Sequence, residues 1–566
     1  MQKRTLNEFY SDLKANLVNE NFLDCIDLLT LAIQEYPKEY KLKLNLGNIY
    51  KMLGQMDNAI NIYTELLSTS LKNIAHNNLS AIMLETGQLE KSIDHARNAL
   101  RDNDDYYDAK YNLAVGLFEN KSYMESLNIC ENLLNVESYE NKAYELKIRI
   151  KQIICDWNDY LKTENILKKN KIFVHPFLHI SCISNESSNY TNAKAWNKNN
   201  ESLKLNKSPL PMPSKVRMGF LCGEIRNHPT FHLIKNFFKN INKDIFSIYM
   251  FSYGHETDKK LLIENDFNEF VDISQLNTTE SVSKVKSYDL EILIDLTTII
   301  SYNRSQIVNQ GVAKIIISYL AYPGTTGNHA YDYILTDKVV TPKEQQKYYT
   351  EQFMYLPKSY QINNGEINTD ITNKRSDFNL PEGFIILGCL NQSFKLDPVF
   401  FDIWINVLQR YDNTCLWLLD YGDEMRKNIN NFIDNRIESE RIIYADRIEY
   451  ELHLERIQHI DIALDTRIYN GHTTTIEMIQ AGIPLITYKG NHFASRVSAS
   501  ILNTLELELL ITDSHEEYEE KIISLIDEET RISHKNLIKK KINTSNLLNI
   551  KNFTNDFEQA ILKCFK

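Results

Sequence analysis

An internal repeat occupies residues 1–137, and it constrains the fold of the chain more than any other feature. The pairs Leu46-Gly47, Leu79-Ser80 and Leu113-Ala114 recur at spacings of 33 and 34. A small residue recurs with the same period in the second half of each unit, as Cys25, Ala59, Ser92 and Ser126. A unit of this length cannot bury its own apolar face, so neighbouring units must stack. The period predicts about four units between residues 5 and 137, followed by a degenerate one.

A period of this length with paired amphipathic helices is typical of tetratricopeptide repeats. Such repeats stack into a superhelix whose concave face binds extended peptides. Asn45, Asn78 and Asn112 each precede the repeated leucine. An asparagine amide has both a donor and an acceptor, so a column of asparagines is suited to hold a peptide backbone without reading its side chains. The alternative is that these positions reflect only the high frequency of Asn in this chain.

The pattern changes after the repeats. Residues 138–213 predict a helical transition, and its end, 195–214, is polar and proline-rich like a linker. Short β-rich runs then alternate with helical segments, six runs in 214–375 and six in 376–566. Such alternation predicts a parallel, doubly wound sheet whose ligands lie at the carboxyl ends of the strands. The chain is therefore expected to be an α-solenoid at 1–137 followed by two Rossmann-like α/β lobes.

Residues 461–497 contain the pattern that is most specific for a ligand. An apolar run ending at Asp465 predicts a buried strand, and Gly471, His472, Thr473 and Thr474 lead into a segment with helical periodicity. A turn from strand to helix presents backbone N–H groups and the positive end of the helix dipole, which together bind anions. The hydroxyl and imidazole groups add donors, so the predicted anion is a phosphate or diphosphate. The alternative is an ordinary helix cap, for which Thr is a common residue.

Four further motifs precede this turn in a fixed order. The five are CDWNDY (155–160), NHPTFH (227–232), YPGTTG (322–327), LNQSFKLDP (390–398) and NGHTT (470–474), the last followed by AGIPLIT and ASRVSAS. With the repeats before them, they resemble the O-GlcNAc transferase and SPINDLY family, which is glycosyltransferase family 41. The resemblance implies a GT-B fold, a nucleotide-sugar donor bound between the two lobes, and an acceptor polypeptide held by Asn45, Asn78 and Asn112.

In the first lobe the resemblance singles out His228 and Pro323. His228 follows the first predicted strand, and an imidazole there has a pKa range suited to take a proton from a hydroxyl near neutral pH. In the family this histidine lies beside the reacting sugar and has been proposed as the base, while Pro323 is implied to bring backbone close to the sugar. Thr298, Ile299 and Ile300 depart from the family, in which many members have a Gly-His-Thr or Gly-Tyr-Thr turn at this point.

In the second lobe, Gln392 and Lys395 follow the first predicted strand. A lysine at the carboxyl edge of a sheet is a mobile point charge, well suited to a departing β-phosphate. The alternative is a solvated surface lysine. The resemblance implies that both residues contact the donor, together with Gly471, His472, Thr473 and Thr474.

The nucleoside half of the donor is implied to lie near residues 450–477. His453 occupies the position of the family's imidazole that stacks on the base, and Arg456, three residues later on the same helical face, matches the UDP-using branch. Glu477 replaces an Asp of the animal enzymes and is still able to accept ribose hydroxyls. Tyr450 replaces a Lys and cannot make its charged contact.

Composition excludes several other classes of protein. A net charge of −12 argues against a general nucleic-acid binder. No apolar run is long enough for a membrane span or for a signal peptide. The eight cysteines are scattered without a CxxC pair, which favours reduced thiols in a cytoplasmic protein. No Asp-x-Asp pair ends a predicted catalytic strand, so we expect no metal and no cofactor other than the donor substrate.

Together these features predict an enzyme that transfers a sugar, GlcNAc from UDP-GlcNAc as the first choice, to Ser or Thr hydroxyls of a protein held by the repeats. The expected reaction is a single inverting, metal-independent displacement. A protein O-fucosyltransferase, an N-glycosyltransferase of the same fold and a catalytically silent repeat scaffold stay open as alternatives. A decaying site would be expected to lose its donor-binding residues, but all of them are present: Gln392, Lys395, His453, His472, Thr473 and Glu477.

Overall fold

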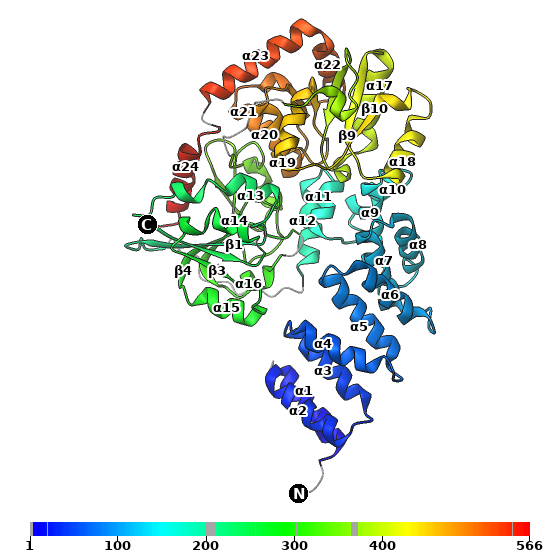
Figure 1. Ribbon diagram of the computed structural model, residues 1–566. Coiled ribbons are helices and arrows are strands. Elements are labelled where there is room, and N and C mark those ends of the chain that lie inside the picture. Colours follow the sequence, from blue (N-terminus) through cyan, green and yellow to red (C-terminus); the bar gives the residue numbers. More distant parts are fainter. Residues whose placement is uncertain are drawn as a thin grey trace. The chain divides into compact units, whose positions relative to one another are not determined.

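A computed structural model describes residues 4–19, 21–198, 210–254, 256–300, 303–363, 372–545 and 547–565 (Figure 1). The chain divides into two compact units, Met1–Ile150 and Lys151–Lys566. Each unit is described by itself below.

The first unit is built from antiparallel helix pairs. Its helices are α1 (Leu6–Val18), α2 (Phe22–Glu35), α3 (Tyr40–Met52), α4 (Met56–Leu66), α5 (Lys72–Glu85), α6 (Leu89–Leu100), α7 (Tyr107–Glu119), α8 (Tyr123–Leu133) and α9 (Glu140–Ile153), which runs into the second unit. The four predicted pairs are confirmed. The small residues that define the period, Cys25, Ala59, Ser92 and Ser126, are all fully buried. At Gly47 a Cβ atom would lie 2.7 Å from the Tyr63 ring, so only glycine allows α3 and α4 to approach this closely.

The second unit begins with a helical segment, α10 (Tyr160–Lys168), α11 (Pro176–Cys182) and α12 (Glu186–Trp196). Trp157 of the CDWNDY motif packs on Phe401 and Phe432, with ring centroids 5.1 and 4.9 Å apart. This motif therefore attaches the helical segment to the second α/β lobe. The predicted linker, 195–214, overlaps the end of α12, and its residues 199–209 lie outside the described part of the chain.

The first lobe contains a parallel sheet of seven strands in the order β3-β2-β1-β4-β5-β6-β7. The strands are β1 (Val216–Cys222), β2 (Phe246–Ser252), β3 (Glu269–Asp272), β4 (Leu290–Asp295), β5 (Ala313–Ser318), β6 (Tyr333–Thr336) and β7 (Gln352–Tyr355). The helices are α13 (Pro229–Ile234), α14 (Thr257–Leu261), α15 (Thr278–Lys286) and α16 (Ser305–Asn309), with 3-10 turns at Phe238–Asn240, Glu264–Asp266 and Lys343–Tyr348. All six predicted strands are present, and β3 is additional.

The second lobe contains a parallel sheet of six strands in the order β10-β9-β8-β11-β12-β13. The strands are β8 (Ile385–Cys389), β9 (Thr414–Leu419), β10 (Ile442–Ala445), β11 (Ile462–Leu464), β12 (Leu485–Tyr488) and β13 (Ile511–Thr512). The helices are α17 (Pro398–Arg410), α18 (Asp423–Ile433), α19 (Tyr450–Arg456), α20 (Thr473–Gln480), α21 (Val497–Thr504), α22 (His515–Ile526), α23 (Glu528–Thr544) and α24 (Ile550–Leu562). The 3-10 turns are Arg375–Phe378, Ser393–Lys395, Ser439–Arg441, Ile457–His459, Phe493–Ser495 and Glu508–Leu510.

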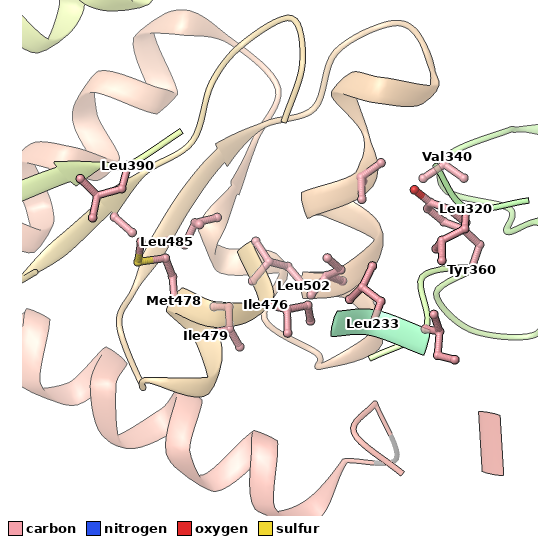
Figure 2. Close-up of a cluster of buried hydrophobic side chains, with 14 of the residues drawn as sticks. Leu233, Leu320, Val340, Tyr360, Leu390, Ile476, Met478, Ile479, Leu485 and Leu502 are labelled. Carbon is pink, nitrogen blue, oxygen red and sulfur yellow. The ribbon is translucent and has the colours of Figure 1, made fainter. Parts of the chain in front are cut away.

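One large hydrophobic cluster joins the two lobes. Helix α20 contributes Ile476, Met478 and Ile479 to it (Figure 2). Leu233 of α13, in the first lobe, belongs to the same cluster and is drawn near Ile476 and Leu502 in Figure 2. Burial of this apolar surface, to which both α13 and α20 contribute, therefore links the two lobes.

Helix α24 returns to the first lobe. Phe553 and Phe557 pack on Phe237, with ring centroids 6.1 and 5.0 Å apart, and Glu558 Oε1 accepts a hydrogen bond from the Asn242 N–H at 2.6 Å. Residues 376–566 were expected to form the second lobe with closing C-terminal helices. These aromatic contacts show that the last of these helices, α24, packs on the first lobe.

Candidate functional site

The turn between β11 and α20 is fixed by a buried carboxylate, Asp465. Its Oδ1 accepts hydrogen bonds from the N–H groups of Gly471 and Thr466 at 2.7 and 2.9 Å, and its Oδ2 accepts one from Thr487 Oγ1 at 2.7 Å. At Gly471 a Cβ atom would lie only 2.6 Å from Thr474 Oγ1, so glycine is required. Asp465 was not among the predicted site residues. Its signal in the sequence is a carboxylate directly after an apolar strand and shortly before the turn glycine.

The first residue of the turn helix is not capped in the usual way. The N-cap of α20 is His472, at φ 43°, a left-handed conformation that is uncommon for residues other than glycine. Within the described residues its side chain makes no capping hydrogen bond. The simple alternative of a threonine N-cap is therefore absent, and Thr473 and Thr474, both partly exposed, form the first helical turn.

His472 itself faces inward. Its ring stacks on Tyr469 with centroids 4.7 Å apart, and its Nε2 lies 3.2 Å from the carbonyl oxygen of Ala494. Because a carbonyl only accepts, Nε2 carries the proton and donates to Ala494. Burial, followed by the charge of Lys395, lowers the pKa of His472 well below its usual value. His472 is thus a neutral anchor between the turn and the segment around Ala494, although we had expected its donor to face the anion.

Lys395 reaches the same turn from the end of β8. Its Nζ donates to the carbonyl oxygen of Asn470 at 2.8 Å and to Asn391 Oδ1 at 3.4 Å, and it lies 4.7 Å from the centroid of the Tyr469 ring. Thr474 Oγ1 donates to the same Asn391 Oδ1 at 2.9 Å. Burial lowers the pKa of Lys395 to about 8, opposed by the nearby Asp465, so the amine is still mostly charged at neutral pH. The structure therefore brings Lys395 together with the 471–474 turn, whereas the Gln392 side chain is exposed beside them.

A second group of predicted residues meets where α19 approaches α20. Arg456 is 2% exposed, and its Nε donates to His453 Nδ1 at 3.2 Å, while its guanidinium also donates to the carbonyl oxygen of Asp446. Burial lowers the pKa of Arg456 to about 10. Arg456 was singled out because it matches the UDP-using branch of the family. In the structure it orients His453, because its buried position directs its donors to neighbouring residues.

Glu477 lies opposite this pair, on α20. Its Oε2 is 3.5 Å from His453 Nε2, and its Oε1 accepts a hydrogen bond from the Tyr450 hydroxyl at 3.0 Å. From the sequence, Tyr450 was expected only to lack the charged contact of the lysine that it replaces. The structure shows that it contacts Glu477 directly and that its ring also stacks on His232 of the first lobe, with centroids 4.1 Å apart.

His228 lies at the start of α13 in the first lobe. Its Nδ1 accepts a hydrogen bond from the Thr230 N–H at 3.2 Å and lies 3.6 Å from Glu224 Oε2. Burial lowers the pKa of His228, and this effect outweighs the opposing charge of Glu224. The ring is therefore neutral at pH 7. With Nδ1 accepting the Thr230 N–H, its proton lies on Nε2, so His228 in this geometry presents a hydrogen-bond donor rather than a free base.

Pro323 is buried in the loop after β5. Its neighbour Tyr322 belongs to a small apolar cluster with Tyr469 of the second lobe and Ile299 of the first. The loop that contains Pro323 therefore packs against the second lobe. In the preceding loop, Thr298 has φ 56°, which a β-branched residue rarely adopts and which explains why glycine suits this position in the family pattern.

The predicted asparagine column lies in the repeat unit. Asn45, Asn78 and Asn112 are half-buried residues of α3, α5 and α7, the first helices of consecutive pairs. Asn78 Nδ2 donates to Asn48 Oδ1 at 3.2 Å, and Asn112 Nδ2 donates to Asn77 Oδ1 at 2.9 Å. The amides thus link successive first helices.

Among the described residues, no three His, Cys, Asp or Glu side chains are grouped as metal ligands would be. No helix there combines the length and apolar character that crossing a bilayer requires.

Known proteins that are similar to this chain point to one family. A model of glycosyl transferase family 41 matches residues 154–370 and 364–557. A protein of Arabidopsis thaliana named probable UDP-N-acetylglucosamine–peptide N-acetylglucosaminyltransferase SEC is 33% identical over 323 residues, which are 55% of this chain and 33% of that protein. The UDP-N-acetylglucosamine–peptide N-acetylglucosaminyltransferase of Caenorhabditis elegans is 23% identical over 560 residues, 73% of this chain and 48% of that protein. The chain thus spans a third to a half of these relatives.

Among solved structures, a mutant of the Thermobaculum terrenum O-GlcNAc transferase is similar to this chain with a TM-score of 0.69. The two chains are 19% identical, and the match covers 93% of this chain and 97% of the other. At this identity the likeness establishes the fold, which is a GT-B pair of lobes preceded by helical repeats.

Proposed function

The chain belongs to glycosyl transferase family 41, and from this premise we propose that it transfers GlcNAc from UDP-GlcNAc to Ser or Thr hydroxyls of a protein acceptor. The observation that carries the proposal is the convergence of Lys395 with the N-terminus of α20 at the carboxyl edge of the second sheet. The relatives' names give the donor and the peptide acceptor of those proteins.

The proposed reaction is a single displacement with inversion. The acceptor oxygen forms a bond to the anomeric carbon while the bond from that carbon to the β-phosphate oxygen breaks and UDP departs. Lys395 and the dipole of α20 stabilise the charge that develops on the diphosphate. Because these groups supply positive charge, the scheme needs no metal and no cofactor.

The acceptor proton must leave during this step. For this step we propose that the ring proton of His228 shifts from Nε2 to Nδ1, which faces Glu224 Oε2 3.6 Å away, and that the freed Nε2 takes the proton of the acceptor hydroxyl. In the tautomer that caps α13, His228 instead donates to the donor sugar or its phosphate. We propose that His228 has this donor role before the reaction and acts as the base during transfer. Pro323 is proposed to shape the backbone beside the sugar.

The nucleoside is proposed to lie at the α19–α20 pair. Glu477 accepts ribose hydroxyls, and His453, held by Arg456, stacks on the base. Gln392, Gly471, His472, Thr473 and Thr474 complete the donor site that we propose. The acceptor polypeptide is proposed to bind along Asn45, Asn78 and Asn112 of the repeat unit, and the protein is proposed to act in the cytoplasm.

Nucleotide selectivity tests the proposal directly. A ligand at 100 times its dissociation constant stabilises a protein by roughly 2.7 kcal/mol. We therefore expect UDP and UDP-GlcNAc to raise the melting temperature in a thermal-shift assay, with GDP near the baseline. A preferential shift with GDP or GDP-fucose would assign the chain to fucosyl transfer. No shift with any nucleotide, and no UDP release from UDP-GlcNAc, would leave only the scaffold alternative.

The asparagine column has a separate expected effect. Changing Asn45, Asn78 and Asn112 together to Ala should lower the transfer of labelled GlcNAc to a Ser/Thr peptide library by tenfold or more, about the effect of losing several peptide hydrogen bonds. Acceptor-independent hydrolysis of UDP-GlcNAc should stay unchanged, because donor binding uses residues of the other unit.

A matched triple variant provides the control. Asn58, Asn98 and Asn128 are exposed residues on the second helices α4, α6 and α8 of the same pairs. Their joint change to Ala should leave both activities intact. If the column variant lost hydrolysis and transfer equally, the repeats would support the catalytic fold rather than bind the acceptor.

A further inference from the structure

Tyr450 of α19 contacts the first lobe at the site. Its ring lies on the ring of His232 with centroids 4.1 Å apart and planes inclined by 18°, which is a stacked arrangement. Stacked aromatic pairs contribute beyond the area that they bury. Tyr450 belongs to α19 and His232 to α13, so this stack connects the nucleotide side of the second lobe with the sugar side of the first.

The hydroxyl of Tyr450 points to the other half of the site. It donates to Glu477 Oε1 at 3.0 Å, and Glu477 is 4% exposed. Burial, followed by the charge of Glu477, raises the pKa of Tyr450, so the hydroxyl keeps its proton and acts as the donor. One side chain thus has two functional ends: a hydroxyl on the proposed ribose carboxylate and a ring face on His232.

His232 in turn contacts Asn227, the residue before His228. Its Nε2 lies 2.9 Å from Asn227 Oδ1, and because a carbonyl oxygen only accepts, Nε2–H is the donor. Asn227 directly precedes His228, the N-cap of α13. The contacts therefore run from Glu477 through Tyr450, His232 and Asn227 to His228.

Packing in this region makes the connection stiff. Leu233, next to His232, lies in the same buried hydrophobic cluster as Ile476, next to Glu477 (Figure 2). Glu477 and His232 are thus each next to a residue of this buried cluster, where close packing leaves little room for displacement.

From these contacts we propose that Tyr450 is a positioning residue that couples the nucleotide half of the site to the placement of His228 beside the sugar. The proposal rests on the function proposed above. It assigns the hydroxyl to nucleotide affinity and the ring to turnover, acting through His232 and Asn227.

Variants separate the two ends of the side chain. Tyr450→Phe keeps the ring and should raise the KM for UDP-GlcNAc a fewfold with kcat nearly unchanged. Tyr450→Leu also removes the stack and should lower kcat for UDP-GlcNAc hydrolysis by about tenfold, since misplacement of a reacting group by about 1 Å costs up to a hundredfold. Asn227→Ala should lower kcat by a similar factor and leave the UDP dissociation constant, measured by calorimetry, within twofold of the unmodified protein.

The double variant shows whether Tyr450→Leu and Asn227→Ala lower kcat through the same series of contacts. If Tyr450 acts through His232 and Asn227, then Tyr450→Leu combined with Asn227→Ala should be no slower than either single variant. Tyr444→Phe is the matched control: the Tyr444 hydroxyl is buried and has no hydrogen-bond partner among the described residues, so its removal should change neither KM nor kcat.

Each contrary result has a distinct meaning. Three outcomes would overturn this inference while the unmodified protein still bound UDP. The losses in kcat from Tyr450→Leu and Asn227→Ala could multiply in the double variant. Tyr450→Leu could keep full turnover, or Asn227→Ala could lose affinity for UDP. Failure of the unmodified protein to bind UDP would overturn the proposed function and the inference with it.

Discussion

Lys395→Ala is expected to lower kcat for sugar transfer by about a hundred- to a thousandfold, the usual result of removing one group that stabilises developing charge. Nζ lies within hydrogen-bond distance of the Asn470 carbonyl oxygen, directly before the turn into α20. Without it, the departing diphosphate keeps only the helix dipole and the turn as positive partners. Initial rates of UDP release measure this effect.

The fold should survive this change. Lys395 lies in a 3-10 turn at the end of β8, and its side chain is only partly buried. The melting temperature of Lys395→Ala should therefore stay within a few degrees of the unmodified protein. Lys489→Ala is the control, because Lys489 pairs with Asp513 on the exposed surface of the same lobe. Near-normal turnover in Lys395→Ala would show that this amine does not serve the leaving group.

Asp465→Ala is expected to destabilise the protein by about 3 kcal/mol or more, because each buried donor left unsatisfied costs about 1–3 kcal/mol. The donors affected are the N–H groups of Gly471 and Thr466 and the hydroxyl of Thr487. The turn into α20 should lose its shape at the same time. Thermal denaturation and UDP calorimetry should therefore both report a large loss.

Asp465→Asn is the matched variant. The amide keeps the size of the side chain and an oxygen that accepts from both N–H groups, while its Nδ2 faces Thr487 Oγ1, which is able to accept. It should lose far less stability than Asp465→Ala. If the alanine variant melted and bound UDP like the unmodified protein, the turn would not depend on this carboxylate.

The sequence predicted those elements whose signal is local. Strand β11, the turn at Gly471 and the helix after it follow from an apolar run, a glycine and a helical period. Strand β3 was missed because Glu269 and Asp272 are exposed at the edge of the sheet, where only Val271 is buried. A strand with one buried residue leaves no pattern in the sequence.

The site was predicted less completely, because its contacts join residues distant in the chain. Lys395 and the 470–474 turn lie 75 residues apart, and their meeting was anticipated from their positions at strand ends. The sequence did not predict that the side-chain donors of Arg456 and His472 bond to neighbouring protein groups, because this depends on their burial in the folded chain. His232 and Tyr450 belong to different lobes and lie far apart in the chain, so the sequence carries no signal that they stack.

Helix α24 has a consequence for the order in which the molecule folds during synthesis. Asn242 and Glu558, which it joins by a hydrogen bond, are 316 residues apart in the chain. Until residues 550–562 have been synthesised, Phe237 lacks the covering that Phe553 and Phe557 provide. Exposed apolar surface of this kind makes a nascent domain prone to aggregate and dependent on chaperones. The first lobe to emerge from the ribosome is thus the last to acquire its complete core.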